Sequence, residues 1–212
     1  MFRQSREWYR IHLDTNRPLL AVILIGIASL ALSLSATADT NEKATSPLPA
    51  AKQTTLGLYA TAKDAYELWR AAPEAIKIID VRTPEEFLFI GHADMAWNIP
   101  LAKQSYEWDP EKKQLPMSLL PDFVTRVQTV AGTDDTLLVM CRSGGRSAMA
   151  VNLLAQAGFK NVYNITDGVE GDAVKEPNSV FHGQRLVNGW KNSALPWTYA
   201  IDPDRMVLPV EH

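Results

Sequence analysis

The chain has 212 residues, of which 46% are hydrophobic and 21% charged, and this composition is typical of a globular domain with a hydrophobic core. Its net charge of −3 argues against a nucleic-acid-binding protein, because such proteins carry a basic patch. The single cysteine, Cys141, excludes an intramolecular disulfide. The histidines are scattered, and no Cys/His spacing predicts a metal site. They are His12, His92, His182 and His212.

The N-terminal segment 1–38 has the pattern of a signal peptide. A basic stretch through Arg17 precedes an apolar run over 19–36 and an A-x-A cleavage pattern that ends at Ala38. We expect cleavage after Ala38. The alternative is an uncleaved anchor, the one contact with a membrane that we expect, because 18 apolar residues are near the minimum for crossing a bilayer. Basic flanks stay in the cytoplasm, so both alternatives place the rest of the chain outside it, in a bacterial periplasm.

The rest of the chain divides by composition into three parts. Residues 39–55 are rich in Thr, Ala, Pro and Lys, lack an apolar period and predict a flexible linker. We expect one folded domain over 56–200, since no internal repeat is visible. Residues 201–212 are predicted to be a C-terminal tail.

The first half of the predicted domain contains short helices and strands. Thr61 is the expected N-cap of a helix that runs to about residue 72. Its apolar face carries Ala65, Leu68 and Trp69. The β-branched segment 76–81 predicts a strand that is buried on both faces. Thr83, Pro84 and Glu86 then form a capping-box pattern that starts a second helix.

The second half alternates strands with helices. A brief strand is predicted over 96–99, a surface excursion over 103–117 and a helix over 119–130. The most apolar strand candidate is 136–140. A helix over 147–157, a strand over 162–165 and a longer excursion over 168–188 follow. This alternation predicts an α/β domain with a mainly parallel sheet covered on both faces.

The segment that follows the strand 136–140 carries the candidate site. It consists of Cys141, Arg142, Ser143, Gly144, Gly145, Arg146 and Ser147. Ligands of parallel sheets bind beyond the carboxyl ends of the strands, which is where this loop lies. The glycine pair lets successive N–H groups point inward as an anion-binding nest at the start of the next helix.

Two arginines in this loop add positive charge beside the cysteine. Arg142 and Arg146 together with the N–H groups favour a thiolate at Cys141 without a partner histidine. The alternative is a buried structural cysteine followed by an ordinary turn. The small polar residues and arginines directly after the strand disfavour that alternative. Cys141 is therefore the candidate nucleophile.

Four separate segments resemble rhodanese domains. The loop 141–147 looks like their active-site loop, and the segment 80–87, DVRTPEEF, resembles their D-V-R-x-x-x-E-F motif. Gly91-His92-Ala93 followed by Asn98-Ile99-Pro100 is similar to their G-H and N-I-P run. Gly189-Trp190 and Leu195-Pro196-Trp197 resemble their C-terminal end. The resemblance covers about residues 56–199, although Phe89-Ile90 and Asp94-Met95 replace a smaller turn of the family.

This resemblance implies a rhodanese-like domain with a central five-stranded sheet and a thiosulfate sulfurtransferase activity. Cys141 would carry a persulfide taken from thiosulfate or another sulfane-sulfur donor, and a thiol or cyanide would accept the sulfur. Residues 142–147 would bind the substrate, whereas Asp80 and Arg82 would support the base of the pocket. Their alternative roles are a strand-end hydrogen bond and a surface salt bridge. No metal or organic cofactor is implied.

Two rival functions remain open at this point. Phosphatase-like and arsenate-reductase-like loops also pair a cysteine with an arginine, but five residues separate the two in those loops. Only four residues separate Cys141 from Arg146. The other rival is a persulfide carrier that hands sulfur to one protein partner, and the same loop would serve it.

Overall fold

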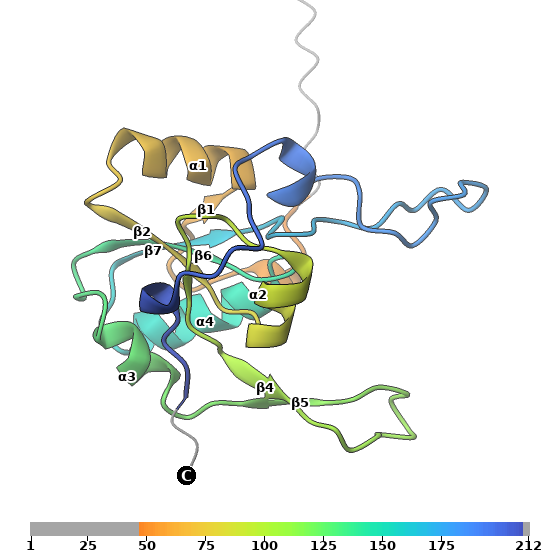
Figure 1. The fold of residues 1–212 in the computed structure, drawn as a ribbon, viewed down its shortest axis with the longest axis horizontal. Helices are drawn as coiled ribbons and strands as arrows, with labels where there is room; N and C mark the ends of the chain where they lie inside the picture. Colours follow the sequence, from red (N-terminus) through yellow and green to blue (C-terminus); the bar gives the residue numbers. More distant parts are fainter. Residues whose placement is uncertain (1–46, 210–212) are drawn as a thin grey trace, which may run out of the picture. The chain divides into compact units, whose positions relative to one another are not determined.

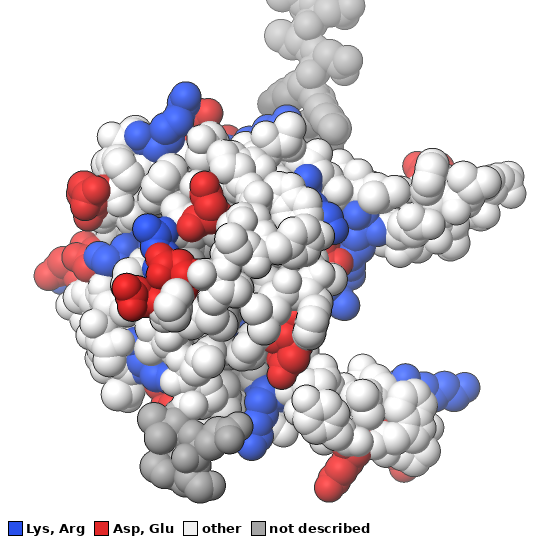
Figure 2. Space-filling model, in the orientation of Figure 1, with Lys and Arg blue, Asp and Glu red and all other residues white. Residues whose placement is uncertain are grey.

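The computed structural model describes residues 47–209 (Figure 1). The predicted signal segment 1–38 lies outside the described residues. Within 47–209 no helix combines the length and the apolar character that crossing a bilayer requires. Figure 2 shows both acidic and basic side chains on the visible face of this part, with several lysine and arginine side chains gathered beside the base of the projection at the upper right.

A five-stranded parallel sheet forms the centre of the domain, as predicted. Its strands in spatial order are β1 (Tyr59–Ala60), β7 (Asn161–Ile165), β6 (Thr136–Met140), β2 (Ile76–Asp80) and β3 (Trp97–Asn98). All four neighbouring pairs are parallel. All carboxyl ends therefore lie at one edge of the sheet, and Cys141 follows β6 there.

Helices cover both faces of this sheet (Figure 1). They are α1 (Ala62–Ala71), α2 (Pro84–Ile90), α3 (Phe123–Gln128) and α4 (Gly145–Gln156). Side chains of α3 and α4 pack with Ile79 and Val139 in one core cluster. Side chains of α1 and α2 pack with Ile78 and Leu138 in the other. Successive strand residues thus point into opposite cores, which explains the uninterrupted apolar strands.

Capping boxes start the first two helices, where the sequence predicts an N-cap at Thr61 and a capping box at Thr83. The Thr61 hydroxyl accepts the N–H of Asp64, and the Thr83 hydroxyl accepts the N–H of Glu86. Both acidic side chains accept the N–H of their cap in return. Leu68 differs from the expectation, since it is 41% exposed and Ala62 joins Ala65 in the core instead.

The segment 117–123 differs from the helix predicted over 119–130. Met117–Leu119 forms β5, which pairs antiparallel with β4 (Ala102–Gln104), and α3 begins only at Phe123. A residue that precedes proline is biased away from helical geometry, and Pro121 follows Leu120. The Leu120 N–H accordingly donates to the Leu101 carbonyl rather than within a helix.

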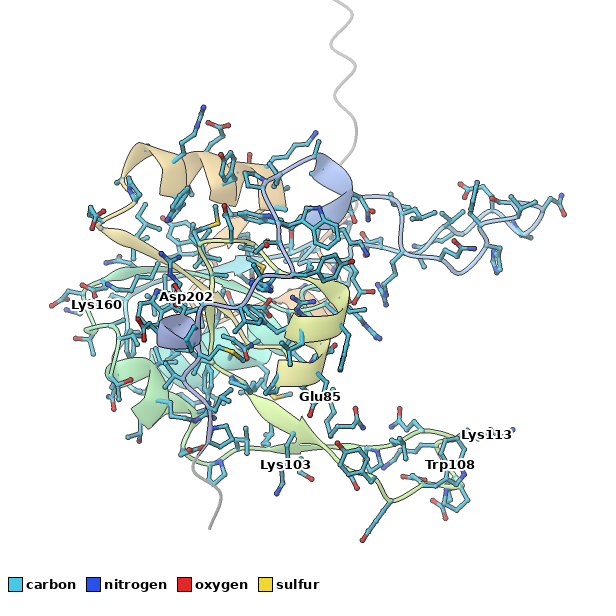
Figure 3. The ribbon with its side chains drawn as sticks, in the orientation of Figure 1. Glu85, Lys103, Trp108, Lys113, Lys160 and Asp202 are labelled. Carbon is cyan, nitrogen blue, oxygen red and sulfur yellow. The ribbon has the colours of Figure 1, made fainter. Side chains whose placement is uncertain are left out.

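Two loops project from the domain on the same side (Figure 1). The first runs from β4 to β5 and corresponds to the predicted excursion 103–117. The second lies within 168–188 and is closed by backbone hydrogen bonds between Val174 and residues 183 and 184. Figure 3 places Trp108 and Lys113 toward the tip of the first projection, with Lys103 near its base.

Segments predicted as linker and tail lie against the domain where they are described. The Thr55 N–H donates to the Asn152 side chain, and Lys52 pairs with Asp172 at 3.1 Å. Short 3-10 helices occupy Ala50–Lys52, Lys191–Ser193 and Pro203–Arg205. The Val207 N–H donates to the Asn98 carbonyl at 2.9 Å, so the C-terminal segment extends along β3.

Two phenylalanines of α2 provide a matched test of this packing. Phe87 is 2% exposed in the core and Phe89 is 78% exposed. We predict that Phe87→Ala lowers the free energy of unfolding by about 3–5 kcal/mol, because it leaves a cavity. Phe89→Ala should change it by less than about 0.5 kcal/mol. Urea unfolding measures both, and equal losses would contradict the assigned packing.

Candidate active site

Cys141 lies at the carboxyl edge of the sheet with its side chain 2% exposed. The loop that follows turns back over the sulfur. The Gly144 N–H donates to Cys141 Sγ at 3.2 Å, and Gly144 has a φ of 96°. A Cβ atom at this position would overlap the Thr166 carbonyl, so both the conformation and the space require glycine.

Helix α4 begins directly after this turn, two residues earlier than predicted. Gly144 is its N-cap, and Gly145 is its first residue. The N-terminal end of a helix carries partial positive charge, and here it faces the turn that holds the sulfur. The helix end and the Gly144 N–H therefore both favour an anionic sulfur at Cys141.

A second segment of backbone supports the loop. The N–H groups of Val169 and Glu170 donate to the carbonyls of Cys141 and Arg142 at 2.8 and 2.9 Å. Gly168 precedes them with a φ of 61°, and a Cβ atom there would overlap the Cys141 carbonyl oxygen. The start of the excursion 168–188 is thus part of the frame that holds Cys141.

Ser147 and Asn164 lie on the inner side of the sulfur. The Ser147 hydroxyl is 3.5 Å from Cys141 Sγ and 2.6 Å from Asn164 Oδ1. The Asn164 amide nitrogen donates to the carbonyls of Gly144 and Lys52 at 3.1 and 2.9 Å. Ser147 and Asn164 are fully buried. A polar cluster therefore connects β7 and α4 to the sulfur of Cys141.

Arg146 forms a bidentate ion pair with Glu86 of α2. Both η nitrogens of Arg146 donate to the carboxylate at 2.6 Å, and both side chains are about one-fifth exposed. Burial alone would lower the pKa of Arg146, but the hydrogen bonds and charge of Glu86 raise it. Burial alone would likewise raise the pKa of Glu86, but Arg146 holds it below its ordinary value. The pair fastens the loop to α2.

Asp80 and Arg82 form a fully buried ion pair beneath α2. Arg82 Nη2 donates to Asp80 Oδ2 at 2.7 Å and to the Gly91 carbonyl at 2.8 Å. Burial would lower the pKa of Arg82, whereas the adjacent Asp80 raises it. Arg82 Nη1 also donates to the Glu86 carbonyl at 3.4 Å. Asp80 and Arg82 are connected to the loop through Glu86, and neither is exposed at the surface.

The remaining loop residues are less buried than Cys141. Arg142 is exposed, and its side chain makes no hydrogen bond or ion pair with any residue of 47–209. Ser143 and Gly145 are half-buried. Over the same range, no three His, Cys, Asp or Glu side chains lie close enough to hold a metal ion. The two arginines of the loop thus differ, since Glu86 neutralises Arg146 and only Arg142 presents its charge to solvent.

Comparison with known proteins agrees with this geometry. The rhodanese-like domain family matches residues 61–173. The chain belongs to this family. The crystal structure of Rv0390 from M. tuberculosis has a similar fold. Its sequence is 25% identical to this chain, and the two structures match with a TM-score of 0.53. That match covers 67% of this chain and 99% of the other.

Two curated relatives extend the comparison. Thiosulfate sulfurtransferase 16, chloroplastic, of Arabidopsis thaliana is 40% identical over 92 residues, which are 43% of this chain and 69% of the relative. An uncharacterized protein of Rickettsia prowazekii is 31% identical over 122 residues, or 58% of this chain and 82% of that protein. The family assignment therefore confirms the resemblance seen in the sequence.

Three residues of the site were not among the sequence-based candidates. The sequence pattern of Glu86 predicts only a helix cap, and its pairing with a residue sixty positions away has no local signal. Asn164 lies in a predicted strand, and a polar residue in an otherwise apolar strand is a signal that could have identified it. Gly168 was assigned to an excursion, and its positive φ is visible only in the structure.

The Glu86–Arg146 pair predicts how stability depends on pH. The pKa of Glu86 is lowered in the folded state from 4.5, so its stabilisation is complete above about pH 4.5 and is lost as pH falls through the lowered value. We predict that Glu86→Gln lowers the free energy of unfolding by about 1–3 kcal/mol at pH 7. Chemical unfolding of both proteins between pH 7 and 3 should show the difference shrinking below pH 4.5. A difference that is constant across this range would contradict the ion pair.

Proposed function

We propose that this rhodanese-like domain is a sulfurtransferase that moves a sulfane sulfur from thiosulfate or a similar donor through a persulfide on Cys141. The observation that carries the proposal is the placement of Cys141 Sγ under the Gly144 N–H, at the start of α4. The thiosulfate sulfurtransferase of Arabidopsis thaliana among the relatives supports the choice of donor.

The first displacement transfers sulfur to the protein. The Cys141 thiolate attacks the outer sulfur of thiosulfate, a new S–S bond forms, and the original S–S bond breaks. Sulfite leaves with the electron pair of the broken bond, and the protein retains an anionic persulfide. The Gly144 N–H and the N-terminal end of α4 stabilise the negative charge in both states.

The second displacement releases the sulfur. Cyanide or a thiolate attacks the outer sulfur of the persulfide, the persulfide S–S bond breaks, and the Cys141 thiolate is regenerated as the leaving group. The product is thiocyanate or an acceptor persulfide. Because donor and acceptor react in separate steps on one sulfur, the kinetics should be ping-pong.

Arg142 is the side chain best placed to recognise the donor. Its exposed guanidinium can meet the sulfonate group of thiosulfate as that anion approaches the loop. Arg146 has both η nitrogens engaged by Glu86 and acts by holding the loop. Ser143 and Gly145 are half-buried in the same loop, and in this proposal their backbone N–H groups also donate to the anion.

A carrier that serves a protein partner is the second candidate function. It is favoured by large apolar side chains that the two projections expose, among them Tyr106 at 82% and Val180 at 87%. Transfer to a small acceptor makes no use of such side chains. Slow thiosulfate turnover beside rapid transfer to or from a protein would identify this function. A phosphatase-like activity has less support, because the loop from Cys141 to Arg146 is one residue shorter than in those enzymes.

We further propose that the chain is exported to the periplasm of a bacterium. The support is the sequence of 1–38, with its basic flank, apolar run and A-x-A pattern. The intact mass of the protein recovered from the periplasmic fraction tests this proposal. A mature chain that begins after Ala38 agrees with export and cleavage, and a full-length protein in the cytoplasm contradicts export.

The first prediction from this mechanism concerns Cys141. Cys141→Ser should abolish sulfur transfer from thiosulfate to cyanide without unfolding the domain, because no other thiol exists in the chain. Intact mass spectrometry of the thiosulfate-treated wild type should show an added mass of about 32 Da, one sulfur atom, that a reductant removes. Turnover retained by the serine variant, or an adduct on it, would refute the mechanism.

The second prediction separates the two arginines. Arg142→Ala should raise the KM for thiosulfate about tenfold, since a charge-assisted contact with the donor is lost, and Arg142→Lys should recover part of the loss. Arg146→Ala should instead lower the melting temperature, because it leaves the half-buried Glu86 carboxylate without its partner. If only Arg146→Ala raises the KM while thermal stability is unchanged, Arg146 is the donor contact.

A further inference from the structure

The cluster of Cys141, Ser147 and Asn164 contains fewer protons than hydrogen-bond acceptors. Ser147 has one hydroxyl proton and lies between two acceptors, Cys141 Sγ at 3.5 Å and Asn164 Oδ1 at 2.6 Å. The three residues are buried, so no bulk water substitutes for a missing partner. The direction of that proton decides whether Ser147 donates a hydrogen bond to the sulfur or presents only lone pairs to it.

The orientation of the Asn164 amide is fixed by its surroundings. Its nitrogen faces two backbone carbonyls, those of Gly144 and Lys52, and both can only accept hydrogen bonds. A flipped amide would place an oxygen against these carbonyls. Oδ1 must therefore face Ser147, where it can only accept a proton.

The shorter contact identifies the acceptor that Ser147 serves. A separation of 2.6 Å is at the short end for two oxygens and marks a strong hydrogen bond. The 3.5 Å contact is ordinary for a hydroxyl and the larger sulfur atom, but an uncharged thiol sulfur is a weaker acceptor than an amide oxygen. With its proton directed to Asn164, Ser147 presents only lone pairs to the sulfur. Lone pairs suit a thiol, which can donate its hydrogen, and disfavour a thiolate or a persulfide anion.

We propose that Asn164 is a positioning residue that withholds the Ser147 proton from the sulfur of Cys141 and so limits how strongly the loop stabilises the sulfur anion. Turning the proton toward the sulfur would leave Asn164 Oδ1 buried without a partner, which is costly. The anion is then held by the Gly144 N–H and the helix end alone. A persulfide that is held less strongly passes its outer sulfur on more readily.

This proposal rests on the proposed function in taking the Cys141 sulfur as the reacting atom, but its test needs no sulfur transfer. Iodoacetamide alkylates thiolates, so its rate at a pH where the rate still rises reports the thiolate fraction. Loss of all thiosulfate turnover would thus refute the proposed function and leave this experiment readable. Circular dichroism checks that each variant is folded.

Asn164→Val should raise the alkylation rate about tenfold, because the Ser147 proton is released to the sulfur. Ser147→Ala removes the lone pairs that favour the thiol and should raise the rate by about threefold. The double variant should match Ser147→Ala, since Asn164 acts through the hydroxyl. A purely structural role of Asn164 would give the same change in both backgrounds.

Two outcomes would overturn the proposal. A lower alkylation rate in Ser147→Ala than in the wild type would mean that Ser147 donates to the sulfur. A double variant that keeps the full increase of Asn164→Val would mean that Asn164 acts without Ser147. If Asn164→Val does not fold, the direction of the change in Ser147→Ala decides alone.

Discussion

Parallel pairing of β6 with β2 on one side and β7 on the other fixes the position of Cys141. Met140 pairs with Asp80, and Val139 pairs with Asn164. Polar residues at or just beyond the ends of three strands therefore lie at the same edge of the sheet. Because both faces of these strands are buried in apolar cores, a shift of register by one residue would exchange the two cores. The packing of the sheet therefore fixes the positions of the site residues.

Backbone groups rather than charged side chains face the Cys141 sulfur. One N–H and the start of a helix face Cys141, while Arg146 is neutralised by Glu86. Glu86 is itself held by its capping box and by Arg82, which is paired with Asp80. The buried acidic and basic groups thus form a chain of supports that ends at the loop. Preorganised dipoles of this kind need no rearrangement when the proposed reaction places charge on the sulfur.

Local patterns were sufficient to predict much of the fold. Apolar runs predicted β2 and β6, and the threonine caps predicted the starts of α1 and α2. β1 was missed because its two residues, Tyr59 and Ala60, give too short a pattern. The sequence predicts too early a start for α3, because the apolar helical period extends back to Leu120 although Pro121 biases that residue against helical geometry.

In the site, too, the sequence predicts residues that are neighbours in the chain but not those that only the fold brings together. Loop residues 141–147 are contiguous, so the sequence indicates them directly. Glu86 and Asn164 approach the loop only through the tertiary fold, across 60 and 17–23 positions of the chain. The different states of Arg142 and Arg146 also depend on which arginine meets Glu86, which the spacing of the two does not reveal.

The C-terminal segment beside β3 also bears on how the domain behaves in solution. Met206 forms a bridge with Asn98, and the Arg126 guanidinium fastens this segment by donating to the Val207 carbonyl at 3.0 Å. Outer strands of a sheet carry unpaired backbone groups that can recruit another chain. A domain truncated at residue 200 would uncover the edge of β3 beside the apolar side chain of Trp97. Self-association of such a fragment would then follow from the missing cover rather than from any change at Cys141.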